Sequence, residues 1–502
     1  MLKILDTQQI RALDDYTIQH KSIASIDLME RACLAFVQWF VTRFDATKKI
    51  DVICGTGNNG GDGLGIARIL HDWGYSVNVW IVQGSMKETE DFKINLGRMP
   101  EKIKVSKFTD SSQPEVFSSH VLIDAIFGSG LSRSPEGIYE RAIQSMNDCQ
   151  AVRIAVDIPS GLFTDKHSKG TIVHADYTVS FQMPKLAFLF PENNKYVGKW
   201  STVDIGLDKN FIKEAKTSYY LLTPWSVKKI LRQRSTFDHK GHYGHALMIA
   251  GSYGKMGACV LAARASLRAG VGLLTVHIPK TGYSILQSTV PEAMTSMDIN
   301  NEVFSECPSL DSYDVIGVGP GLGRAEETTT ALKKLFVSGK SLVVDADALN
   351  IISAHPALIQ SIPARSILTP HPKEFERLVG PWKDDFERLE KQIRLAKETK
   401  STIILKGAHT SIATPEGDVY FNNTGNPGMA TGGSGDVLTG ILTGLFAQKY
   451  SADETAILGV YLHGLAGDIA AHEKGVNSLI ASDLIDFLPA AFKDLLRITS
   501  PN

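Results

Sequence analysis

Residues 426–440 read Asn-Pro-Gly-Met-Ala-Thr-Gly-Gly-Ser-Gly-Asp-Val-Leu-Thr-Gly, a glycine-rich loop that runs into an apolar, helix-forming segment. The window 425–440 holds six of the chain's 43 glycines, and Asp436 stands where the loop meets the expected helix. Glycines let a backbone approach a ligand closely, and the free N–H groups of a helix's first turn attract an anion. The stretch therefore predicts a phosphate-binding loop with a carboxylate beside it.

Asp436 has two interpretations. As the cap of the helix it would contribute about 1 kcal/mol of stability, which is a common arrangement. However, the preceding Gly433-Ser434-Gly435 is more flexible than a cap requires. A carboxylate beside an anion site can deprotonate a hydroxyl group that then attacks phosphorus. We favour this second interpretation, in which Asp436 is a catalytic base.

Length and composition describe an ordinary globular protein. A chain of 502 residues predicts two or three domains, and 43% hydrophobic with 21% charged residues is typical of folded soluble chains. A formal net charge of −2 gives no field that would attract nucleic acid or an anionic membrane. We therefore expect small-molecule substrates, no nucleic-acid or membrane partner, and a homo-oligomer.

The five cysteines are scattered and form no Cys-x-x-Cys pair, which is typical of reduced thiols rather than a disulfide frame or a structural zinc site. The first residues contain no apolar signal core, and no later stretch offers about 18 uninterrupted apolar residues. The expected location is the cytoplasm.

Strand-like and helical patterns alternate in the first part of the chain. Asp6-Thr7 and Ser25 are expected to cap two opening helices. Apolar runs typical of buried parallel strands follow at Ile50–Cys54, Val77–Val82, Val121–Phe127 and Val152–Ile158, with a helical pattern at Leu64–Trp73. This order predicts one α/β layered sandwich that closes near Gly206.

The segment Ile205–Thr223 is charged and loses the strand rhythm, which is typical of a linker. A second α/β series follows it. Its expected strands are His245–Ala250, Gly272–Ile278, Val315–Val318, Leu342–Asp345, Ser366–Thr369 and Thr402–Leu405. Its expected helices are Ala258–Ala269, Glu326–Phe336, Asp384–Glu398, Val437–Phe446 and Ala452–His472. The two halves are therefore expected to be different α/β folds fused in one chain.

A second glycine-rich motif, Gly55-Thr56-Gly57-Asn58-Asn59-Gly60-Gly61-Asp62-Gly63, lies between a predicted strand and a predicted helix. Its Gly-x-Gly-x-x-Gly core alone is a weak sign of dinucleotide binding. The next strand ends Ile81-Val82-Gln83-Gly84 and lacks the acid that holds the ribose in nicotinamide-dependent dehydrogenases. We therefore reject an ordinary dehydrogenase. The amide and carboxylate groups of this motif are suited to phosphate and sugar hydroxyls.

Two further loops leave the carboxyl ends of later strands, where ligands bind in open α/β sheets. They are Asp124-Ala125-Ile126-Phe127-Gly128-Ser129-Gly130-Leu131 and Asp157-Ile158-Pro159-Ser160-Gly161-Leu162. The oxygen ligands of Asn59, Asp124 and Ser160 could share one small cation, which leaves Asp157 free for proton transfer. A single Asp in such a loop more often caps a helix or forms a turn, but three glycine-flanked polar clusters favour a site.

Together these three motifs resemble the NAD(P)H-hydrate epimerase domain, which interconverts the two C6 epimers of hydrated NAD(P)H. The resemblance implies that Asn59, Asp124 and Ser160 hold potassium and that Asp157 transfers the proton. It also implies that the nucleotide is bound by Asn58, Asn59, Gly60, Gly61, Asp62, Gly128, Ser129, Gly130, Leu131, Ser132, Arg133, Ser134, Tyr139 and Asp157.

Four more motifs converge on strand ends in the second half of the chain: Gly251–Ala258, Gly317–Gly323, Thr369-Pro370-His371-Pro372-Lys373-Glu374 and Lys406-Gly407-Ala408-His409-Thr410. No Gly-x-x-x-x-Gly-Lys-Ser/Thr sequence occurs, so the chain is not a P-loop enzyme. Lys406 either pairs with a phosphate or extends from a strand end, and His371 is expected to face the cleft. The histidines of 239–245 have no carboxylate or thiolate partner nearby, which argues against zinc.

The Gly-Ser-Gly-Asp loop resembles that of the ribokinase-like superfamily, and the wider motif set resembles ADP-dependent NAD(P)H-hydrate dehydratase. The fold class expected from both resemblances is α/β: a Rossmann-like three-layer αβα sandwich followed by a ribokinase-like αβα domain. The expected boundaries are 1–210 for the epimerase, 211–223 for the linker and 224–498 for the dehydratase. The resemblance implies that Ala258, Gly321, His371 and Asp436 contact the hydrate, and that Lys406, Gly407, Ala408, His409, Thr410 and Gly435 contact the adenine nucleotide.

The implied function is nicotinamide nucleotide repair. The first domain would interconvert the R and S hydrates, and the second would dehydrate the S form with consumption of ADP, yielding AMP and phosphate. Asp436 would activate the hydroxyl group, and magnesium would bridge the nucleotide phosphates. ATP remains an alternative donor. The competing hypotheses are a ribokinase-like kinase for a sugar or pyrimidine alcohol, and a binding scaffold without activity.

Overall fold

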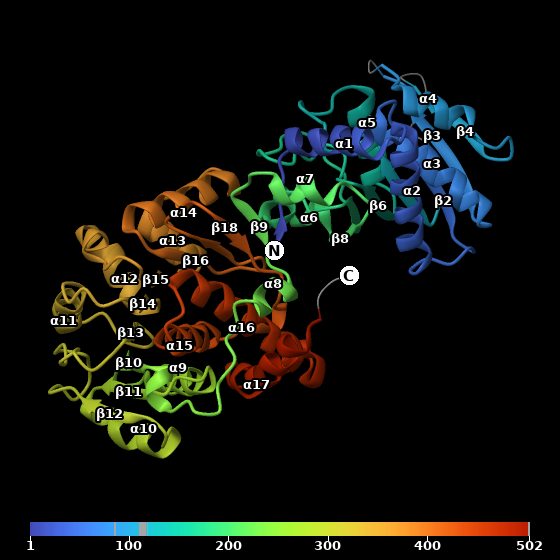
Figure 1. Ribbon diagram of the computed structural model, residues 1–502. Coiled ribbons are helices and arrows are strands. Elements are labelled where there is room, and N and C mark those ends of the chain that lie inside the picture. Colours follow the sequence, from blue (N-terminus) through green and yellow to red (C-terminus); the bar gives the residue numbers. More distant parts are fainter. Residues whose placement is uncertain (85–86, 110–116, 118, 500–502) are drawn as a thin grey trace. The chain divides into compact units, whose positions relative to one another are not determined.

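The chain forms two compact units in the computed structural model, which describes residues 1–84, 87–109, 117 and 119–499 (Figure 1). One unit holds Lys3–Thr217 and Asp384–Phe386, and the other holds Met1–Leu2, Ser218–Lys383 and the chain from Glu387 onward. We call them the amino-terminal and the carboxy-terminal unit. None of the described helices is both long and apolar enough to span a bilayer.

The amino-terminal unit is built on a sheet of seven strands, and every neighbouring pair in it is parallel. Its order is β4 (Lys104–Phe108), β3 (Ser76–Val82), β2 (Lys49–Cys54), β5 (Val121–Ala125), β6 (Val152–Val156), β7 (Tyr177–Phe181) and β8 (Lys199–Val203). The chain runs outward from β2 in one direction and from β5 in the other. A ligand crevice is therefore expected at the carboxyl ends of β2 and β5.

Helices cover both faces of this sheet. They are α1 (Thr7–Lys21), α2 (Ser25–Val41), α3 (Asn58–Asp72), α4 (Glu90–Gly97), α5 (Ile138–Asn147), α6 (Asn194–Val197) and α7 (Lys209–Glu214), with short 3₁₀ turns at Leu186–Leu189 and Pro191–Asn193. Ile123 of β5 packs in one core cluster with Phe36 of α2, whereas its neighbour Leu122 packs in a second cluster with Ile143 of α5. Successive strand residues face opposite sides of a sheet, so the unit has the predicted three layers.

The carboxy-terminal unit is built on a sheet of eleven strands. Its order is β1 (Leu2–Lys3), β9 (Tyr219–Leu221), β18 (Val419–Phe421), β17 (Ser411–Ala413), β16 (Thr402–Leu405), β15 (Ile367–Leu368), β14 (Leu342–Val344), β13 (Val315–Val318), β10 (His245–Ile249), β11 (Leu273–Ile278) and β12 (Met294–Met297). The strands from β16 to β12 pair in parallel, and β17 pairs antiparallel with both β16 and β18. The carboxyl ends of the parallel strands therefore meet at one edge, where the predicted motifs lie.

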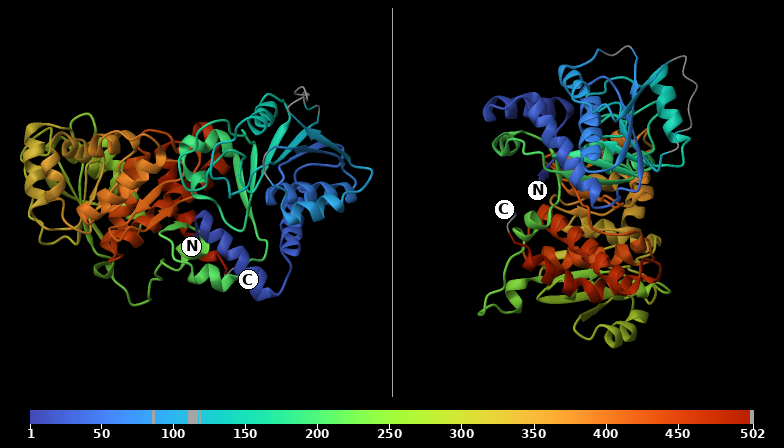
Figure 2. Two further views of the ribbon diagram at one scale, coloured as in Figure 1. Left: turned by 90° about the horizontal axis from the view of Figure 1, so that it is seen from above. Right: turned by 90° about the vertical axis from the view of Figure 1, so that its right-hand side faces the viewer.

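Its helices are α8 (Pro224–Lys228), α9 (Met256–Arg268), α10 (Tyr283–Thr289), α11 (Glu326–Phe336), α12 (Ala346–Ala354), α13 (Pro372–Val379), α14 (Asp385–Thr399), α15 (Ser434–Ala447), α16 (Ala452–Lys474) and α17 (Ala481–Arg497), with short 3₁₀ turns at Lys240–Tyr243, Lys280–Gly282, Pro356–Ser361, Pro427–Met429 and Val476–Ser478. α16 and α17, red in Figures 1 and 2, lie side by side. α15 packs closely on α9, because a Cβ on Gly440 would stand only 2.1 Å from the carbonyl oxygen of Ala262. This packing fixes the start of α15, which carries the glycine-rich loop.

Two local predictions were wrong. Ser25 does not cap α2: Ala24 takes the cap position, the Asp27 carboxylate accepts its N–H at 3.1 Å, and Ser25 donates to Asp91 instead. The stretch 205–223 is not without strands, because β9 pairs with β18. By contrast, the division between the two units, after Thr217, does fall within the predicted linker.

The less favoured interpretation of Asp436, as the helix cap, does not hold. The cap position of α15 belongs to Gly433, whose φ of 92° is in the left-handed region, and no side chain caps the helix. Asp436 instead lies in the first helical turn. Because Asp436 is inside the helix, it cannot be the residue that caps it.

Candidate active sites

A cavity of about 790 Å³ lies at the predicted crevice of the amino-terminal unit. The predicted site residues that line it are Asn58, Asn59, Asp62, Gly128, Ser129, Gly130, Leu131, Ser132, Arg133, Ser134, Tyr139 and Asp157. Three motifs that are far apart in the sequence therefore line one cavity. Gly60 and Gly61 are not among the lining residues, and both are buried.

The Asn-Asn-Gly-Gly-Asp motif is part of helix α3 rather than a loop, since α3 begins at Asn58. The glycines are needed for packing: a Cβ on Gly60 would stand 1.9 Å from the carbonyl oxygen of Gly55, and one on Gly63 would stand 2.6 Å from Ala125 Cβ. This close approach lets α3 start directly against the ends of β2 and β5. The first turn of α3, with its anion-attracting N–H groups, thus faces the cavity.

Asp124 and Ser160, two of the predicted potassium ligands, are fully buried and directly bonded. The Ser160 hydroxyl donates to Asp124 Oδ1 at 2.6 Å, and the Ser160 N–H donates to Asp124 Oδ2 at 2.7 Å. Burial raises the pKa of Asp124 to about 6, against the opposing effect of these hydrogen bonds. The third predicted ligand, Asn59, is buried and its side-chain nitrogen has no hydrogen-bond partner among the described residues.

This donor set fits a hard cation such as potassium. It offers the oxygens of a carboxylate, a hydroxyl and an amide on three buried side chains, and in the Asn59 amide only the oxygen, not the unpaired nitrogen, can bind a cation. A bound cation would also offset the burial of the Asp124 charge.

Asp157 is held by an ion pair that the sequence did not predict. The Lys185 ammonium, only 1% exposed, lies 2.8 Å from Asp157 Oδ1, and the backbone N–H of Phe181 donates to the same oxygen at 3.1 Å. Asp157 adopts a φ of 66°, which an L-residue seldom does. The strained backbone and the buried lysine together fix this carboxylate at the cavity wall, as is frequent at functional sites.

The start of α15 forms the anion site predicted from the glycine-rich loop. Among the described residues, the backbone N–H groups of Gly435 and Asp436 donate no hydrogen bond within the protein. The half-buried His463 ring of α16 contacts the Ser434 carbonyl oxygen through Nε2 at 3.0 Å, and desolvation lowers the pKa of His463 to about 4. A neutral imidazole therefore orients this loop, a contact that sequence reasoning missed.

The Asp436 carboxylate has no hydrogen-bond partner in the part of the chain that the structure describes. Burial, followed by the charges of Asp345 and Asp347, raises its pKa to about 6, although Lys406 acts in the opposite direction. A carboxylate with a raised pKa is a stronger base than an ordinary one, and here it stands beside an anion site. This geometry supports the predicted role as a base.

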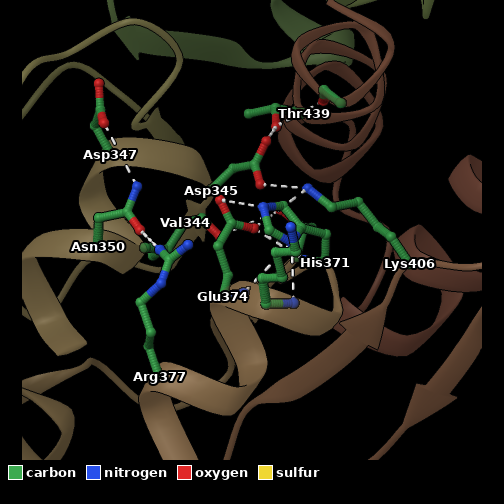
Figure 3. A network of polar contacts seen from close by, with 12 residues as sticks. Val344, Asp345, Asp347, Asn350, His371, Glu374, Arg377, Lys406 and Thr439 are labelled. Atoms are coloured by element: carbon green, nitrogen blue, oxygen red, sulfur yellow. Dashed lines mark hydrogen bonds and ion pairs between the residues drawn. The ribbon is translucent and has the colours of Figure 1, made fainter. Parts of the chain in front are cut away.

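Asp345 lies at the centre of a polar network beside this base (Figure 3). Lys406 Nζ donates to Asp345 Oδ1 at 2.8 Å, and the Thr439 hydroxyl of α15 donates to Oδ2 at 2.7 Å. A Cβ on Gly435 would stand 3.4 Å from Lys406 Nζ, so the lysine is adjacent to the anion site. Lys406 therefore pairs with a carboxylate in the folded chain, which neither of the two alternatives described, and its contact with a phosphate stays a prediction.

His371 caps helix α13 and shares the network shown in Figure 3. Its Nδ1 accepts from the backbone N–H groups of Lys373 and Glu374, and the Glu374 carboxylate accepts the His371 N–H at 2.9 Å. Burial and the nearby Lys406 and Arg377 charges lower the pKa of His371. The ring is therefore neutral at pH 7, and its side chain remains 43% exposed.

The other predicted contacts of this unit fall into two groups. Gly321 and Ala258 are neighbours, because a Cβ on Gly321 would stand 3.1 Å from Ala258 Cβ, and Gly321 has a φ of 61°. The segment Lys406–Thr410 forms a tight turn in which the Thr410 hydroxyl donates to the Gly407 carbonyl at 2.9 Å. Gly407 and Ala408 are exposed in this turn.

The carboxy-terminal unit suits a magnesium ion only if a nucleotide brings further ligands. Nowhere in the described chain do three His, Cys, Asp or Glu side chains converge to hold a metal ion. Magnesium is commonly held by one or two carboxylates together with substrate phosphates. Asp345 and Asp347, on either side of the strand-to-helix turn before α12, can supply such carboxylates.

Comparisons with known proteins agree with this two-site geometry. Residues 246–490 match the family model described as NAD(P)H-hydrate dehydratase, and residues 25–187 match that of the YjeF-related protein N-terminus. The bifunctional NAD(P)H-hydrate repair enzyme Nnr of Moorella thermoacetica is 36% identical over 516 residues, which cover 98% of this chain and 97% of that protein. The chain belongs to the bifunctional NAD(P)H-hydrate repair enzyme family.

Other members of the repair family show the same full-length similarity. The protein of that name from Coxiella burnetii is 34% identical over 491 residues, covering 97% of this chain and 99% of its own. Among solved structures, a ribokinase-like superfamily protein of Enterococcus faecalis V583 is 29% identical with a TM-score of 0.50, covering 57% of this chain and 99% of that one. The predicted α/β fold with a ribokinase-like second domain is confirmed.

The membership also bears on the competing hypotheses. A lone sugar or pyrimidine kinase is not favoured, because both family models match within one chain and full-length relatives are repair enzymes. Sequence reasoning nevertheless missed several residues at the two sites: Asp14, Lys185, Asp345 and His463. Asp345 was the easiest of these to predict, since it ends a predicted strand and directly follows β14, as Asp157 directly follows β6.

Proposed function

We propose that this chain repairs hydrated NADH and NADPH in two steps. Residues 1–210 interconvert the R and S epimers at C6, residues 211–223 connect the domains, and residues 224–498 dehydrate the S form with consumption of ADP. The observation that carries this proposal is the full-length similarity to bifunctional repair enzymes, together with a preserved site in each unit. Fusion of the two activities lets the first replenish the substrate of the second.

In the amino-terminal site, the cavity binds the hydrated nucleotide through the residues predicted above. The N–H groups at the start of α3 and the Arg133 side chain offer positive charge to its phosphates. Asp157 transfers a proton at the reacting carbon. This role is supported by the ion pair with Lys185, which orients the carboxylate.

Asn59, Asp124 and Ser160 would hold a potassium ion in this site. When bound, the ion supplies a fixed positive charge beside the nucleotide. Asp124 also positions the Ser160 loop, since both of its oxygens accept hydrogen bonds from that residue.

In the carboxy-terminal site, Asp436 removes the proton from the C6 hydroxyl of the S hydrate. The hydroxyl oxygen attacks the terminal phosphorus of ADP, and AMP departs. The ring nitrogen then expels the new phosphate group, and loss of a proton from the neighbouring carbon restores the dihydronicotinamide. Phosphorylation thus converts hydroxide, a poor leaving group, into phosphate.

The remaining residues of this site bind and orient the hydrate and the adenine nucleotide. Ala258, Gly321 and His371 contact the hydrate, while Gly435 and Lys406–Thr410 contact the adenine nucleotide. The N–H groups of Gly435 and Asp436 stabilise negative charge on the transferred phosphoryl group. A magnesium ion, which Asp345 and Asp347 would help to hold, supplies further positive charge between the phosphates.

The proposed function is tested by incubating the purified chain with mixed hydrate epimers and ADP. The expected result is a return of the reduced-nicotinamide absorbance from both epimers. No recovery with either ADP or ATP would contradict the proposal. The five thiols are all free, four of them buried, and we further propose a cytoplasmic enzyme that assembles as a homo-oligomer, which light scattering of the purified chain would check.

A further inference from the structure

Three carboxylates from three different elements line the amino-terminal cavity. Asp14 comes from α1, Asp62 from the start of α3, and Asp157 follows β6. Sequence reasoning gave proton transfer to Asp157 alone and did not consider Asp14. Helix α1 nevertheless forms part of the cavity wall through Ile10, Arg11 and Asp14.

These carboxylates differ in the charges that surround them. Asp157 pairs with the buried Lys185 ammonium, whose nitrogen lies 2.8 Å from Asp157 Oδ1. Burial, followed by the charge of Asp157, raises the pKa of Asp14 to about 7, with Asp15 adding to the rise and Lys185 opposing it. The remaining charged groups around the cavity are Asp62, Arg11, Arg133 and Glu136. Near neutral pH, Asp14 can therefore either donate or accept a proton.

The chemistry of the substrate requires two such groups. In the hydrate, C6 carries a hydroxyl group and is bonded to the ring nitrogen. Hydroxide leaves only if an acid protonates it, and the nitrogen lone pair then forms a C6=N bond. Water must next add to the other face of C6 while a base removes its proton. One protonated and one ionised carboxyl group are thus the minimum set for inversion.

We propose that Asp14 is the second proton-transfer residue of the epimerase site and works as an acid–base pair with Asp157 across the C6 carbon. This inference rests on the proposed epimerase function. In one direction, Asp14 gives its proton to the departing oxygen, the C6–O bond breaks and water leaves. A second water attacks the opposite face, Asp157 takes its proton, and the electron pair returns to nitrogen.

The proton and electron balance closes in both directions. Each inversion consumes one water and releases one, and no oxidant or reductant is needed. Afterwards Asp14 is ionised and Asp157 is protonated, which is the starting arrangement for the reverse inversion. Two carboxylates with exchangeable roles therefore suffice for both epimers.

Asp62 is less suited to this exchange. Burial and the charges of Asp157, Asp14 and Asp91 raise its pKa well above the ordinary value. A raised pKa favours the neutral carboxyl group, which can donate a hydrogen bond to the nucleotide. Asp14, on a separate helix, is the group poised for the exchange.

The test follows epimer exchange by the full chain without ADP, with Asp14→Asn, Asp14→Glu and, as matched control, Asp72→Asn at an exposed position outside the cavity lining. Asp14→Asn is expected to slow exchange by about 100-fold, whereas Asp72→Asn leaves it unchanged. The wild-type rate should fall as the pH rises through about 7, because Asp14 then loses the proton it must donate. Asp14→Glu should restore part of the rate and keep a pH limb, whereas Asp14→Asn loses that limb.

Three further measurements separate a catalytic effect from misfolding. In water enriched in ¹⁸O, each inversion should introduce one solvent oxygen at C6 above the uncatalysed background. Recovery of reduced nicotinamide from pure S hydrate and ADP should be unchanged in Asp14→Asn, which shows that the carboxy-terminal unit is intact. Thermal unfolding of Asp14→Asn should match that of the wild-type chain, which shows that the amino-terminal unit is folded.

The outcomes separate this inference from the function on which it rests. If the wild-type chain exchanges epimers but Asp14→Asn does so at the same rate and with the same pH profile, the assignment of Asp14 is wrong. Inversion without uptake of ¹⁸O would also overturn it. A wild-type chain that exchanges no epimers would instead refute the epimerase function itself.

Discussion

The two sites hold their central carboxylates in opposite ways. Asp157 is fixed by a buried ammonium group at 2.8 Å and by a left-handed backbone, whereas Asp436 has no hydrogen-bond partner in the described chain and a pKa raised to about 6. Both carboxylates lie at the carboxyl edge of a parallel sheet, where ligands bind in such folds. The difference shows how one architecture can supply either a carboxylate that an ion pair holds in place or an unpaired carboxylate that is a stronger base.

The largest effect is expected from a substitution of Asp436. Asp436→Asn removes the base and should reduce recovery of reduced nicotinamide from S hydrate and ADP by about 10³-fold or more. Epimer exchange in the same sample serves as the control and should be unchanged. A variant that recovered S hydrate at the wild-type rate would show that another group activates the hydroxyl.

The amino-terminal counterpart is Lys185→Met, which leaves the Asp157 carboxylate without its buried partner. Epimer exchange is expected to fall by about 100-fold, and the amino-terminal unit should lose about 3 kcal/mol of stability. Thermal unfolding and the exchange rate are measured together, with the exposed Lys169→Met as control. Equal rates in the two variants would contradict the role given to the ion pair.

The pH dependence of dehydration tests the raised pKa of Asp436. Dehydration requires ionised Asp436, so its rate should fall as the pH drops through about 6. The charge of Asp347 contributes to this raised pKa, and Asp347→Asn should therefore move the acid limb to lower pH. The exposed Glu326→Gln is the control. An acid limb that stayed in place in Asp347→Asn would argue that a different group titrates.

The smallest expected effect concerns potassium. Replacing potassium with lithium should slow epimer exchange several-fold while leaving dehydration of the S hydrate unchanged, because only the amino-terminal unit holds the Asp124–Ser160 pair. Ser160→Ala should lower the rate and remove this dependence on the cation. Equal sensitivity of both reactions to potassium would contradict the placement of the ion.

Much of the fold could be predicted from the sequence because its central elements are long or strongly apolar. Helix α11 and strands β13 and β16 have the predicted bounds. Strands β17, β18 and β9 were missed, since each has only three residues and gains its stability from its neighbours in the sheet.

The sites were predicted less completely, for a physical reason. Asp157 and Asp436 stand in recognisable glycine-flanked motifs, but Lys185 lies 28 positions after Asp157 and meets it only in the folded chain. Likewise, Asp14 belongs to a helix whose pattern shows amphipathic packing and gives no sign of the cavity that it lines. The helical start of α3 was also missed, because glycines there serve close packing against β2 and β5 rather than flexibility.

The central claim is that one chain carries two separable sites, and mixing two variants tests it most directly. With mixed hydrate epimers and ADP, Asp157→Asn alone should rapidly recover only the S fraction, and Asp436→Asn alone should recover neither epimer. The account predicts that equal amounts of both variants together recover the R and the S fractions in full. Failure of the mixture to recover the R fraction, with each variant folded, would contradict it.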